Sequence, residues 1–589
     1  MKKILLLLSV FASVAAIASP VSPSKAKEVA DSFFGTRSLK MKAYNPTKAS
    51  AQEPSLYVFN REGGGFVIVA GDDAVSPILA YSDRGSFDPA NASASASWWL
   101  GIIDEQIAVI RAVGSRTDER AAKKWKSVST RTKGTPVVEI ATAAWDQGTP
   151  YNNLCSSKVH SGVATGCVAT AAAIVCRYWQ WPQAGEGSCP AYTTDSKNYS
   201  VPANTLGHKY DYSQMPLTNG STASWTSAQK TQVAQLMYDL GQMSYMDYDE
   251  DSGALTSALV NGLVRHMKYN KQAYENFRSA HSDDEWISIL KNELDQKRPI
   301  IYGGSDNEGG HQFVLDGYDS ENFFRVNWGW GGDENGYFQL SSLGKSYKFN
   351  YEQSAIIGLV PDKNGSSASR DVVVLLPYEK GNYYGLTTNA TKFVTGQAFT
   401  VKLGDISNNG AQNFNGTVCV AVYDKNGKWK EDVSTPVSIS AWENTDDYYA
   451  KNGKFNYKYW SSVTCTINGA IKGGDRLRVH YKGEYSDDYA LPYTESTKFE
   501  IVLAEADTYS AAEIAEATSL AYDKTSGKLT LKSDYSVTYK VNNSSGRSVL
   551  SGTLAESVAK ALDFSALEAG TYSIVLNGGS DDLTIKFTL

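Results

Sequence analysis

A cysteine that follows a glycine turn and begins an alanine-rich segment is the clearest candidate for chemistry in this sequence. Cys167 comes directly after Gly166, and residues 167–179 have the composition of a helix that ends before Pro182. Unpaired amides and the positive end of the dipole at a helix N-terminus lower the pKa of a thiol. Because the thiolate is the reactive form, the pattern predicts Cys167 as a nucleophile, against the alternative of a buried thiol in a core helix.

A second group of residues offers a base and an orienting amide. Glycine-rich residues 303–310 lead into a predicted strand opened by His311, and a turn at 319–322 leads into a second strand that carries Asn327. In such a hairpin we expect Asn327 to lie close to the cross-strand neighbours of His311. A thiol at a helix start, a histidine on a strand and an asparagine on the adjoining strand are the nucleophile, base and orienter of cysteine-protease chemistry.

Other polar residues carry weaker signals. Asp316 lies five residues beyond His311, an odd offset that points to the opposite strand face, so we do not expect it to orient the histidine. His160 lies in a polar loop before the glycine turn. The histidine and cysteine spacings do not support zinc, and the acidic loop 247–251 does not match an EF-hand. We therefore expect no metal and no cofactor.

Composition and the first residues indicate an exported protein. Lys2 and Lys3 precede an apolar run that ends in small residues, which predicts a signal peptide over residues 1–18. The net charge of -7 offers no cue for nucleic acid, and no later apolar run is long enough to span a bilayer. We expect a secreted or cell-surface protein.

The chain has 589 residues, too many for a single core, and its patterns divide it. Residues 19–134 read as a small α+β domain followed by a basic linker, and residues 135–362 hold the candidate chemistry. Short strands with regular turn signals predict a β-sandwich over 363–503 and a smaller one over 504–589. The expected fold class is multidomain: an α+β catalytic domain preceded by a small α+β domain and followed by two all-β sandwich domains.

The six cysteines do not predict a complete disulfide framework. If Cys167 is free, an odd number remains, so at least one more thiol is unpaired. Cys419 and Cys465 are either a disulfide pair or two buried thiols on strands.

Several separated motifs resemble the streptopain-like cysteine peptidases, bacterial enzymes with a papain fold. The motifs are Trp145-Asp-Gln-Gly-Thr-Pro-Tyr-Asn152, Ala164-Thr-Gly-Cys-Val-Ala-Thr170, Gly310-His-Gln-Phe-Val-Leu-Asp-Gly317 and Val326-Asn-Trp-Gly-Trp-Gly-Gly332. The resemblance covers about residues 19–362. It implies a papain-like catalytic domain with Cys167 as nucleophile and His311 as proton acceptor, behind an inhibitory prodomain.

The resemblance also implies further site residues. Gln147, in the first motif, is expected to donate to the oxyanion beside the Cys167 amide. From their places after Asn327, Trp328 or Trp330 is expected to shield the hydrogen bond between Asn327 and His311 from water. The loop 246–254 resembles the substrate wall of the family, and the expected substrate-binding residues are Ser252, Gly253, Ala254, Gly310 and Trp328.

The predicted function is a secreted cysteine endopeptidase made as a latent zymogen. Its expected partners are protein or peptide substrates and its own prodomain, which is removed by cleavage between about Arg131 and Thr135. Residues 504–589 resemble C-terminal secretion-tail domains, which implies an export machinery as a further partner. Two alternatives remain: a papain-fold acyltransferase (transamidase), and a surface adhesin whose β-sandwiches bind glycan or host protein beside a relic peptidase domain.

Overall fold

The computed structural model describes most of the chain. The described residues are 19–35, 38–46, 53–113, 119–127, 133–217, 222–305, 310–340, 353–376, 385–494, 499–503, 510–523, 526–535, 537–554, 558–577 and 582–588. The predicted signal peptide, residues 1–18, lies outside them, as does 128–132 in the predicted maturation region.

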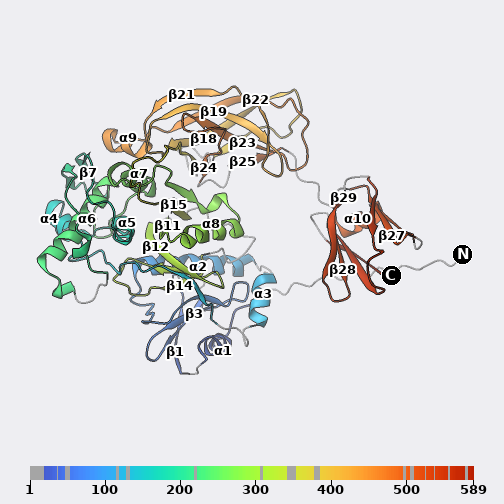
Figure 1. The fold of residues 1–589 in the computed structure, drawn as a ribbon, viewed down its shortest axis with the longest axis horizontal. Helices are drawn as coiled ribbons and strands as arrows, with labels where there is room; N and C mark the ends of the chain where they lie inside the picture. Colours follow the sequence, from blue (N-terminus) through green and yellow to red (C-terminus); the bar gives the residue numbers. More distant parts are fainter. Residues whose placement is uncertain are drawn as a thin grey trace.

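One antiparallel sheet runs through the N-terminal region and the region with the candidate chemistry (Figure 1). Its strand order is β1-β2-β3-β4-β14-β13-β12-β11-β15-β10, and β5 pairs with β12. The strands are β1 (Leu39–Tyr44), β2 (Leu56–Arg61), β3 (Phe66–Ala70), β4 (Ile78–Ser82), β5 (Pro136–Glu139), β10 (Tyr274–Phe277), β11 (Ile300–Ser305), β12 (Gly310–Asp319), β13 (Phe324–Asn327), β14 (Gly336–Phe338) and β15 (Gln353–Ile357).

The two regions join edge to edge at β4 and β14. Tyr81 lies opposite Tyr337, and Ala80 lies opposite Phe338. A Cβ atom at Gly336 would lie 2.6 Å from the carbonyl oxygen of Tyr81, so this close approach requires glycine. The N-terminal region therefore pairs with a strand edge that would otherwise carry unsatisfied backbone groups.

Helices cover both faces of the N-terminal strands. Leu56 and Val58 of β2 point into the core that α2 shares with the main sheet, whereas Tyr57 and Phe59 point into the core under α1. Helix α2 also contacts β12, and α8 packs on β11 and β12. These helices, with the short α3, are α1 (Pro23–Phe34), α2 (Ala94–Val113), α3 (Glu119–Lys126) and α8 (Asp283–Asp295).

A helical lobe with its own core lies against the same sheet. Helix α5 contacts α6, α7, β11 and β12, and every residue from Cys167 to Cys176 is buried. The lobe contains α4 (Asn153–Lys158), α5 (Cys167–Trp179), α6 (Ser227–Met243), α7 (Thr256–His266) and the short strands β6 (Ser188–Cys189), β7 (Tyr192–Thr193), β8 (Ser200–Val201) and β9 (Asn204–Thr205).

The C-terminal part of the chain is rich in strands, as predicted. Two five-stranded sheets enclose one core that includes Val401, Val420 and Trp442. Their strands are β16 (Val373–Leu375), β17 (Leu386–Thr388), β18 (Ala398–Asn408), β19 (Phe414–Tyr423), β20 (Trp429–Asp432), β21 (Val437–Trp442), β22 (Lys458–Thr466), β23 (Arg476–Gly483), β24 (Tyr493–Thr494) and β25 (Glu500–Val502), with helix α9 (Thr445–Asn452).

The last strands form a separate group, drawn in red in Figure 1. A three-stranded and a four-stranded sheet enclose a core that includes Leu531, Val541 and Ile574. The elements are α10 (Ala511–Ala517), β26 (Thr518–Asp523), β27 (Lys528–Ser533), β28 (Val537–Asn543), β29 (Ser548–Leu554), β30 (Lys560–Asp563), β31 (Thr571–Asn577) and β32 (Asp582–Thr588).

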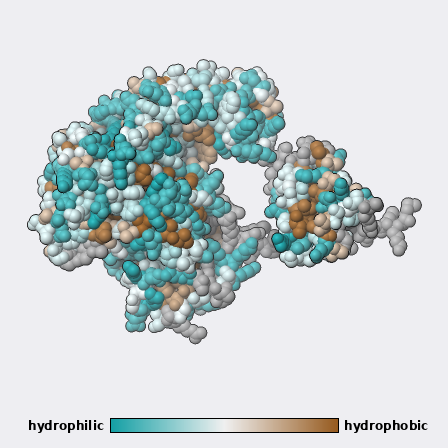
Figure 2. Space-filling view, in the orientation of Figure 1, coloured by the Kyte–Doolittle hydropathy of each residue, from teal (hydrophilic) through white to brown (hydrophobic). Residues whose placement is uncertain are grey.

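The cysteines are all within the described residues, and all six are free and buried. Cys419 lies on β19 and Cys465 on β22, so the structure has buried thiols where a disulfide was the alternative. Figure 2 shows a mostly hydrophilic surface on the visible face, in keeping with the burial of apolar side chains in several cores. None of the described helices has the length and apolar character to cross a membrane.

A buried hydrogen bond across the junction gives the first testable prediction. Tyr81 is fully buried, and its hydroxyl donates to Asp319 Oδ2 at 2.6 Å. Tyr81→Phe removes a donor from a buried carboxylate, which should cost about 1.5–3 kcal/mol. Peptides that cover β4 and β14 should therefore exchange their amide hydrogens faster in Tyr81→Phe than in the parent chain. The control Tyr522→Phe, at an exposed tyrosine of β26, should not change this exchange, and equal protection in both variants would rule out the role of this bond.

Candidate active site

Cys167 is the first residue of α5, and the turn before it requires glycine. Gly166 has a φ of 86°, and a Cβ atom there would lie 2.6 Å from Met246 Sδ and 2.9 Å from the Ser252 carbonyl oxygen. The Thr170 hydroxyl donates to the Gly166 carbonyl at 2.9 Å. The loop that contains Met246 and Ser252 packs against this turn and thereby fixes the position of the Cys167 thiol.

Burial dominates the electrostatics of the Cys167 thiol. The residue is 7% exposed, and burial raises the pKa of its thiol above the ordinary value, opposed by backbone hydrogen bonds from Gln312 and Val168. The sequence predicted a pKa lowered by the helix N-terminus. The structure corrects this expectation because the loss of hydration outweighs the favourable amides. A raised pKa favours the protonated thiol, so a base is needed to make it a nucleophile.

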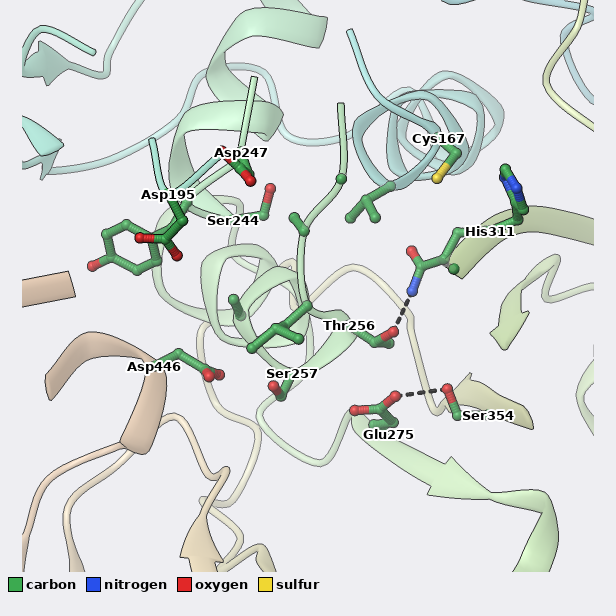
Figure 3. Close-up of a pocket in the computed structure, with 18 of the residues that line it drawn as sticks. Cys167, Asp195, Ser244, Asp247, Thr256, Ser257, Glu275, His311, Ser354 and Asp446 are labelled. Atoms are coloured by element: carbon green, nitrogen blue, oxygen red, sulfur yellow. Dashed lines mark hydrogen bonds between the residues drawn. The ribbon is translucent and has the colours of Figure 1, made fainter. Parts of the chain in front are cut away.

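His311 and Cys167 line the same cavity (Figure 3). His311 is the second residue of β12 and lies opposite Gly304 of β11. Because α5 packs against β12, the two candidate catalytic residues come together from distant parts of the chain. Trp98 of α2 also reaches the histidine, with a distance of 6.0 Å between ring centroids. The N-terminal region therefore contacts the candidate base directly.

Asn327 lies at the end of β13 and is 2% exposed. Its Nδ2 donates to Thr142 Oγ1 at 3.0 Å and to the Ala143 carbonyl at 2.9 Å, and its Oδ1 accepts from the Gly329 amide at 3.2 Å. Both amide hydrogens are therefore used by residues 142 and 143. An interaction with His311 would have to use the remaining capacity of Oδ1.

Asp316 belongs to the same polar network from the other side. It is buried, it accepts a hydrogen bond from the Thr142 hydroxyl, and Arg325 lies 3.3 Å away. Burial raises the pKa of its carboxyl to about 6. Asp316 is thus linked to Asn327 by hydrogen bonds through the Thr142 hydroxyl. From its odd offset in the sequence, Asp316 is not expected to orient His311 directly.

The backbone of Gln147 contacts the turn that precedes Cys167. The Thr165 amide donates to the Gln147 carbonyl at 3.1 Å, which joins the 145–152 segment to the turn that precedes Cys167. Asp146 Oδ1 accepts from the amides of Gln147 and Gly148 and shapes this segment. Gln147 lies far upstream of Cys167 in the sequence, and this backbone hydrogen bond brings its segment to the turn before Cys167.

The predicted substrate wall is tied to the same turn. Ser252 Oγ lies 2.9 Å from the Ala164 carbonyl, and the backbone of Gly253 pairs with that of Asp247. Gly253, Ala254 and Gly310 line the cavity. The backbone groups of Gly253 that were expected to meet a peptide are engaged within the loop in this structure.

Trp328 lies in the core rather than on the cavity. It has no exposed surface, its Nε1 donates to the Glu334 carbonyl at 3.2 Å, and its ring centroid lies 4.7 Å from that of Phe313. It follows Asn327 in the chain, and the predicted shielding of a bond between Asn327 and His311 stays a prediction. The predicted contact with substrate is not available here, because the ring is fully enclosed.

The cavity has a volume of about 850 Å³, and part of its wall was not predicted from the sequence. Asp446, Tyr449 and Phe455 come from the C-terminal strand region, and Ala94 comes from α2. No motif or spacing marks these residues, since their role depends only on how distant regions pack together.

The described residues that could offer a metal three ligands lie outside this site. Cys419, Asp432 and His480 have ligand atoms within 4.8 Å of one another, on β19, β20 and β23. In the acidic loop, Asp247 accepts hydrogen bonds from Ser196, and Asp249 forms an ion pair with Lys197 at 3.3 Å.

Models of protein families match three parts of the chain. The peptidase C10 family matches residues 145–338, the Spi protease inhibitor matches 18–107, and the secretion system C-terminal sorting domain matches 525–589. Streptopain of Streptococcus pyogenes is 35% identical over 341 residues, which cover 52% of this chain and 81% of streptopain. The chain belongs to the peptidase C10 family. The resemblance inferred from the motifs is thereby confirmed, and the matched range contains Gln147, Cys167, His311 and Asn327.

Other relatives of this C10 peptidase differ in length. The thiol protease/hemagglutinin PrtT of Porphyromonas gingivalis is 31% identical over 400 residues, which cover 63% of this chain but only 45% of that relative. A solved fragment of prointerpain A from Prevotella intermedia is 29% identical, covers 55% of this chain and 99% of its own, and has a TM-score of 0.44.

The turn before the nucleophile gives a sharp test in this C10 peptidase. Gly166→Ala should abolish most activity, because the new Cβ must push Met246 and Ser252 away from a backbone that alanine rarely adopts. Hydrolysis of a denatured protein measures the effect. Gly162→Ala is the matched control, since Gly162 also has a positive φ but no atom within 4 Å of its Cβ position. Similar activity in both variants would contradict the packing argument.

The raised pKa of Cys167 predicts a pH dependence for alkylation of the full-length C10 chain. Below the raised pKa the thiol is protonated, so its reactive thiolate fraction should grow as pH rises toward and beyond 9. The rate of iodoacetamide labelling of the Cys167 peptide, measured by mass spectrometry in the unprocessed chain, checks this. A rate that is constant between pH 6 and 8 would mean an already ionised thiol.

Proposed function

We propose that this chain is a secreted cysteine endopeptidase, made as a latent zymogen, that hydrolyses peptide bonds of proteins through an acyl-enzyme. The observation that carries the proposal is the cavity shared by Cys167 and His311 in a chain of the C10 peptidase family. The proposed catalytic residues are Cys167, His311, Asn327 and Gln147.

His311 first takes the proton from Cys167 Sγ, which burial otherwise keeps neutral. The thiolate attacks the carbonyl carbon of the scissile peptide bond, and the carbonyl oxygen becomes an oxyanion. When the tetrahedral intermediate collapses, the C–N bond breaks and His311 gives its proton to the leaving amine. Water, deprotonated by His311, then attacks the thioester and releases the new carboxylate and the free thiol.

The Cys167 amide and the side chain of Gln147 serve the oxyanion, and Asn327 serves the base. The oxyanion accepts from the Cys167 amide at the helix start and from the side-chain amide of Gln147, which the bond from Thr165 keeps close. Asn327 Oδ1 accepts from the imidazole, while the bonds of its Nδ2 to residues 142 and 143 hold the amide in that orientation.

The N-terminal region keeps the enzyme latent. Trp98 packs against His311, Ala94 lines the cavity, and Trp330 Nε1 donates to Ser95 Oγ at 3.2 Å. A substrate that enters this end of the cavity has to displace α2. Maturation between about Arg131 and Thr135 separates the inhibitory region from the enzyme.

The remaining regions serve export and presentation. A signal peptide over residues 1–18 directs the chain across the inner membrane, and the C-terminal region, matched over 525–589 by the sorting-domain model, engages a secretion machinery. The two pairs of facing sheets are β-sandwich domains over 363–503 and 504–589, with a core between the sheets of each. The prodomain covers 19–134 and the catalytic domain 135–362.

Substitution of the two central residues tests the proposal. Cys167→Ala and His311→Ala should each lower cleavage of a denatured protein by about 10³-fold or more, and Cys167→Ala should accumulate as an uncleaved precursor if maturation is autocatalytic. His160→Ala is the control, because His160 is exposed and stacks on Tyr199 away from the cavity lining.

Incubation of the enzyme with a denatured protein and an added amine distinguishes hydrolysis from acyl transfer, the main alternative. Protein fragments with free carboxylates support hydrolysis, whereas incorporation of the amine without cleavage would identify an acyltransferase. Wild-type protein that neither cleaves nor reacts with a thiol-directed covalent inhibitor would favour the adhesin.

A further inference from the structure

The C-terminal strand region forms one end of the cavity that contains Cys167. Asp446 and Tyr449 of α9 and Phe455 beyond it line this cavity together with Cys167 and His311. In Figure 3, Asp446, Asp195 and Asp247 lie away from Cys167, at the other end of the space. A peptide held at Cys167 can therefore extend to residues of the C-terminal region.

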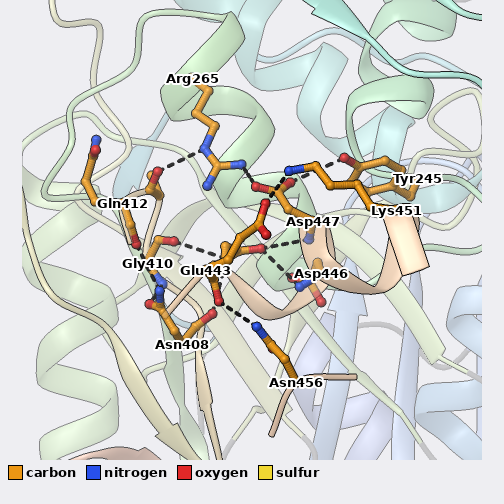
Figure 4. Close-up of polar contacts among 12 residues, drawn as sticks. Tyr245, Arg265, Asn408, Gly410, Gln412, Glu443, Asp446, Asp447, Lys451 and Asn456 are labelled. Atoms are coloured by element: carbon orange, nitrogen blue, oxygen red, sulfur yellow. Dashed lines mark hydrogen bonds and ion pairs between the residues drawn. The ribbon is translucent and has the colours of Figure 1, made fainter. Parts of the chain in front are cut away.

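Polar contacts hold this wall in place (Figure 4). Arg265 of α7 forms an ion pair with Asp447, and the Tyr245 hydroxyl donates to the same carboxylate at 3.3 Å. On the cavity side, the Tyr449 hydroxyl donates to Asp195 Oδ2 at 3.0 Å. The far end of the cavity is thus a joint surface of the catalytic and C-terminal regions.

Among the described residues, the lining of the cavity carries carboxylates without a basic side chain of lysine or arginine. The carboxylates belong to Asp195, Asp247, Asp249, Asp251, Glu275 and Asp446. Two neighbouring basic side chains are already paired, Lys197 with Asp249 and Arg265 with Asp447. Low-dielectric walls with one sign of charge concentrate ligands of the opposite sign.

Asp446 is the carboxylate most in need of a partner. It is 7% exposed, and its Oδ2 has no hydrogen-bond partner among the described residues. Burial raises its pKa to about 6, opposed by a hydrogen bond from Ser257 and by the charge of Arg265. A buried acceptor without a donor is destabilised, and a donor from a ligand would relieve this.

Aromatic rings complete this end of the cavity. The rings of Tyr449 and Phe455 stack at 4.4 Å, and Tyr457 continues the stack at 4.7 Å from Phe455. Phe455 is 43% exposed, so part of its ring is open to a ligand. Ring faces and carboxylates both attract cations, and a long cationic side chain can contact both at once.

We propose that Asp195, Asp446, Tyr449 and Phe455 form a subsite for a lysine or arginine side chain of the protein substrate, away from the scissile bond. This subsite rests on the proposed peptidase function and makes the C-terminal region a determinant of specificity. The flexible stem of the substrate side chain lies along the aromatic stack, and its charged end reaches the carboxylates.

A peptide library tests the subsite with the mature enzyme prepared from the full chain. Peptides of one parent sequence carry Lys, Arg, norleucine or Glu in turn at each position on either side of the scissile bond. At one position away from that bond, kcat/KM for Lys and Arg should exceed that for norleucine by about tenfold, with Glu lowest. The preference should decrease as salt increases, since exposed charges are screened.

Two substitutions assign the preference to this surface. Asp195→Asn and Asp446→Asn should each reduce the ratio of kcat/KM between the Lys and norleucine peptides, whereas the control Asp487→Asn, exposed and outside the cavity lining, should leave it unchanged. Asp195 is exposed, so its variant decides the matter if Asp446→Asn does not fold.

The outcomes separate the two proposals. Cleavage without any preference for a basic residue, or a preference that survives both substitutions, overturns the subsite, and Asp446 would then serve only to bind the N-terminal end of α7. No cleavage of any peptide by the wild type overturns the peptidase function instead.

Discussion

The candidate site depends on the close packing of α5 against β12. Residues 167–176 of α5 are all buried, and alanines at 169 and 171–173 leave little bulk between the helix and its neighbours. A Cβ atom at Gly329 would already lie 3.2 Å from Thr170 Cγ2. Larger side chains here would force strain of about 1–3 kcal/mol or move the helix. The relative position of Cys167 and His311 is therefore set by backbone packing.

The N-terminal region uses the same sheet to reach the site. The pairing of β4 with β14 extends the antiparallel sheet. Helix α2 shares a hydrophobic core with Trp328, the residue that follows Asn327. The same region brings Trp98 of α2 against His311, with 6.0 Å between the ring centroids, and Ala94 of α2 lines the cavity. The proposed latency therefore has a steric basis, because α2 occupies space beside the candidate base.

The C-terminal region enters the site through a few polar contacts. The ion pair between Arg265 and Asp447 joins α7 to α9, and α9 in turn carries the cavity residues Asp446 and Tyr449. A wall built in this way changes the charge of the cavity without changing the catalytic residues. The cluster of Cys419, Asp432 and His480 has a similar origin: Cys419 and His480 are cross-strand partners, although their spacing in sequence carries no metal signal.

Local patterns indicate the elements of the N-terminal region. Helical periodicity over residues 22–34 and 95–113 and apolar runs over 56–60, 66–70 and 78–82 coincide with α1, α2, β2, β3 and β4 to within one residue at each end. Short apolar runs between turn residues suffice for these strands, which are buried on both faces, and helical periodicity suffices for the two helices. The expectation that Trp328 contacts substrate was wrong. A tryptophan beside a site residue can either line a cavity or pack in the core, and the local sequence does not distinguish the two.

Near neighbours in the sequence indicate the candidate cysteine, histidine and asparagine, the order of their motifs and the family to which those motifs point. The folded chain adds that burial raises the pKa of the Cys167 thiol, that residues 142 and 143 engage both hydrogens of the Asn327 amide, and that Asp446 and Tyr449 line the cavity. The reason is physical: propensity and periodicity depend on near neighbours, whereas hydration, hydrogen-bond partners and cavity walls depend on residues that folding brings together from distant parts of the chain.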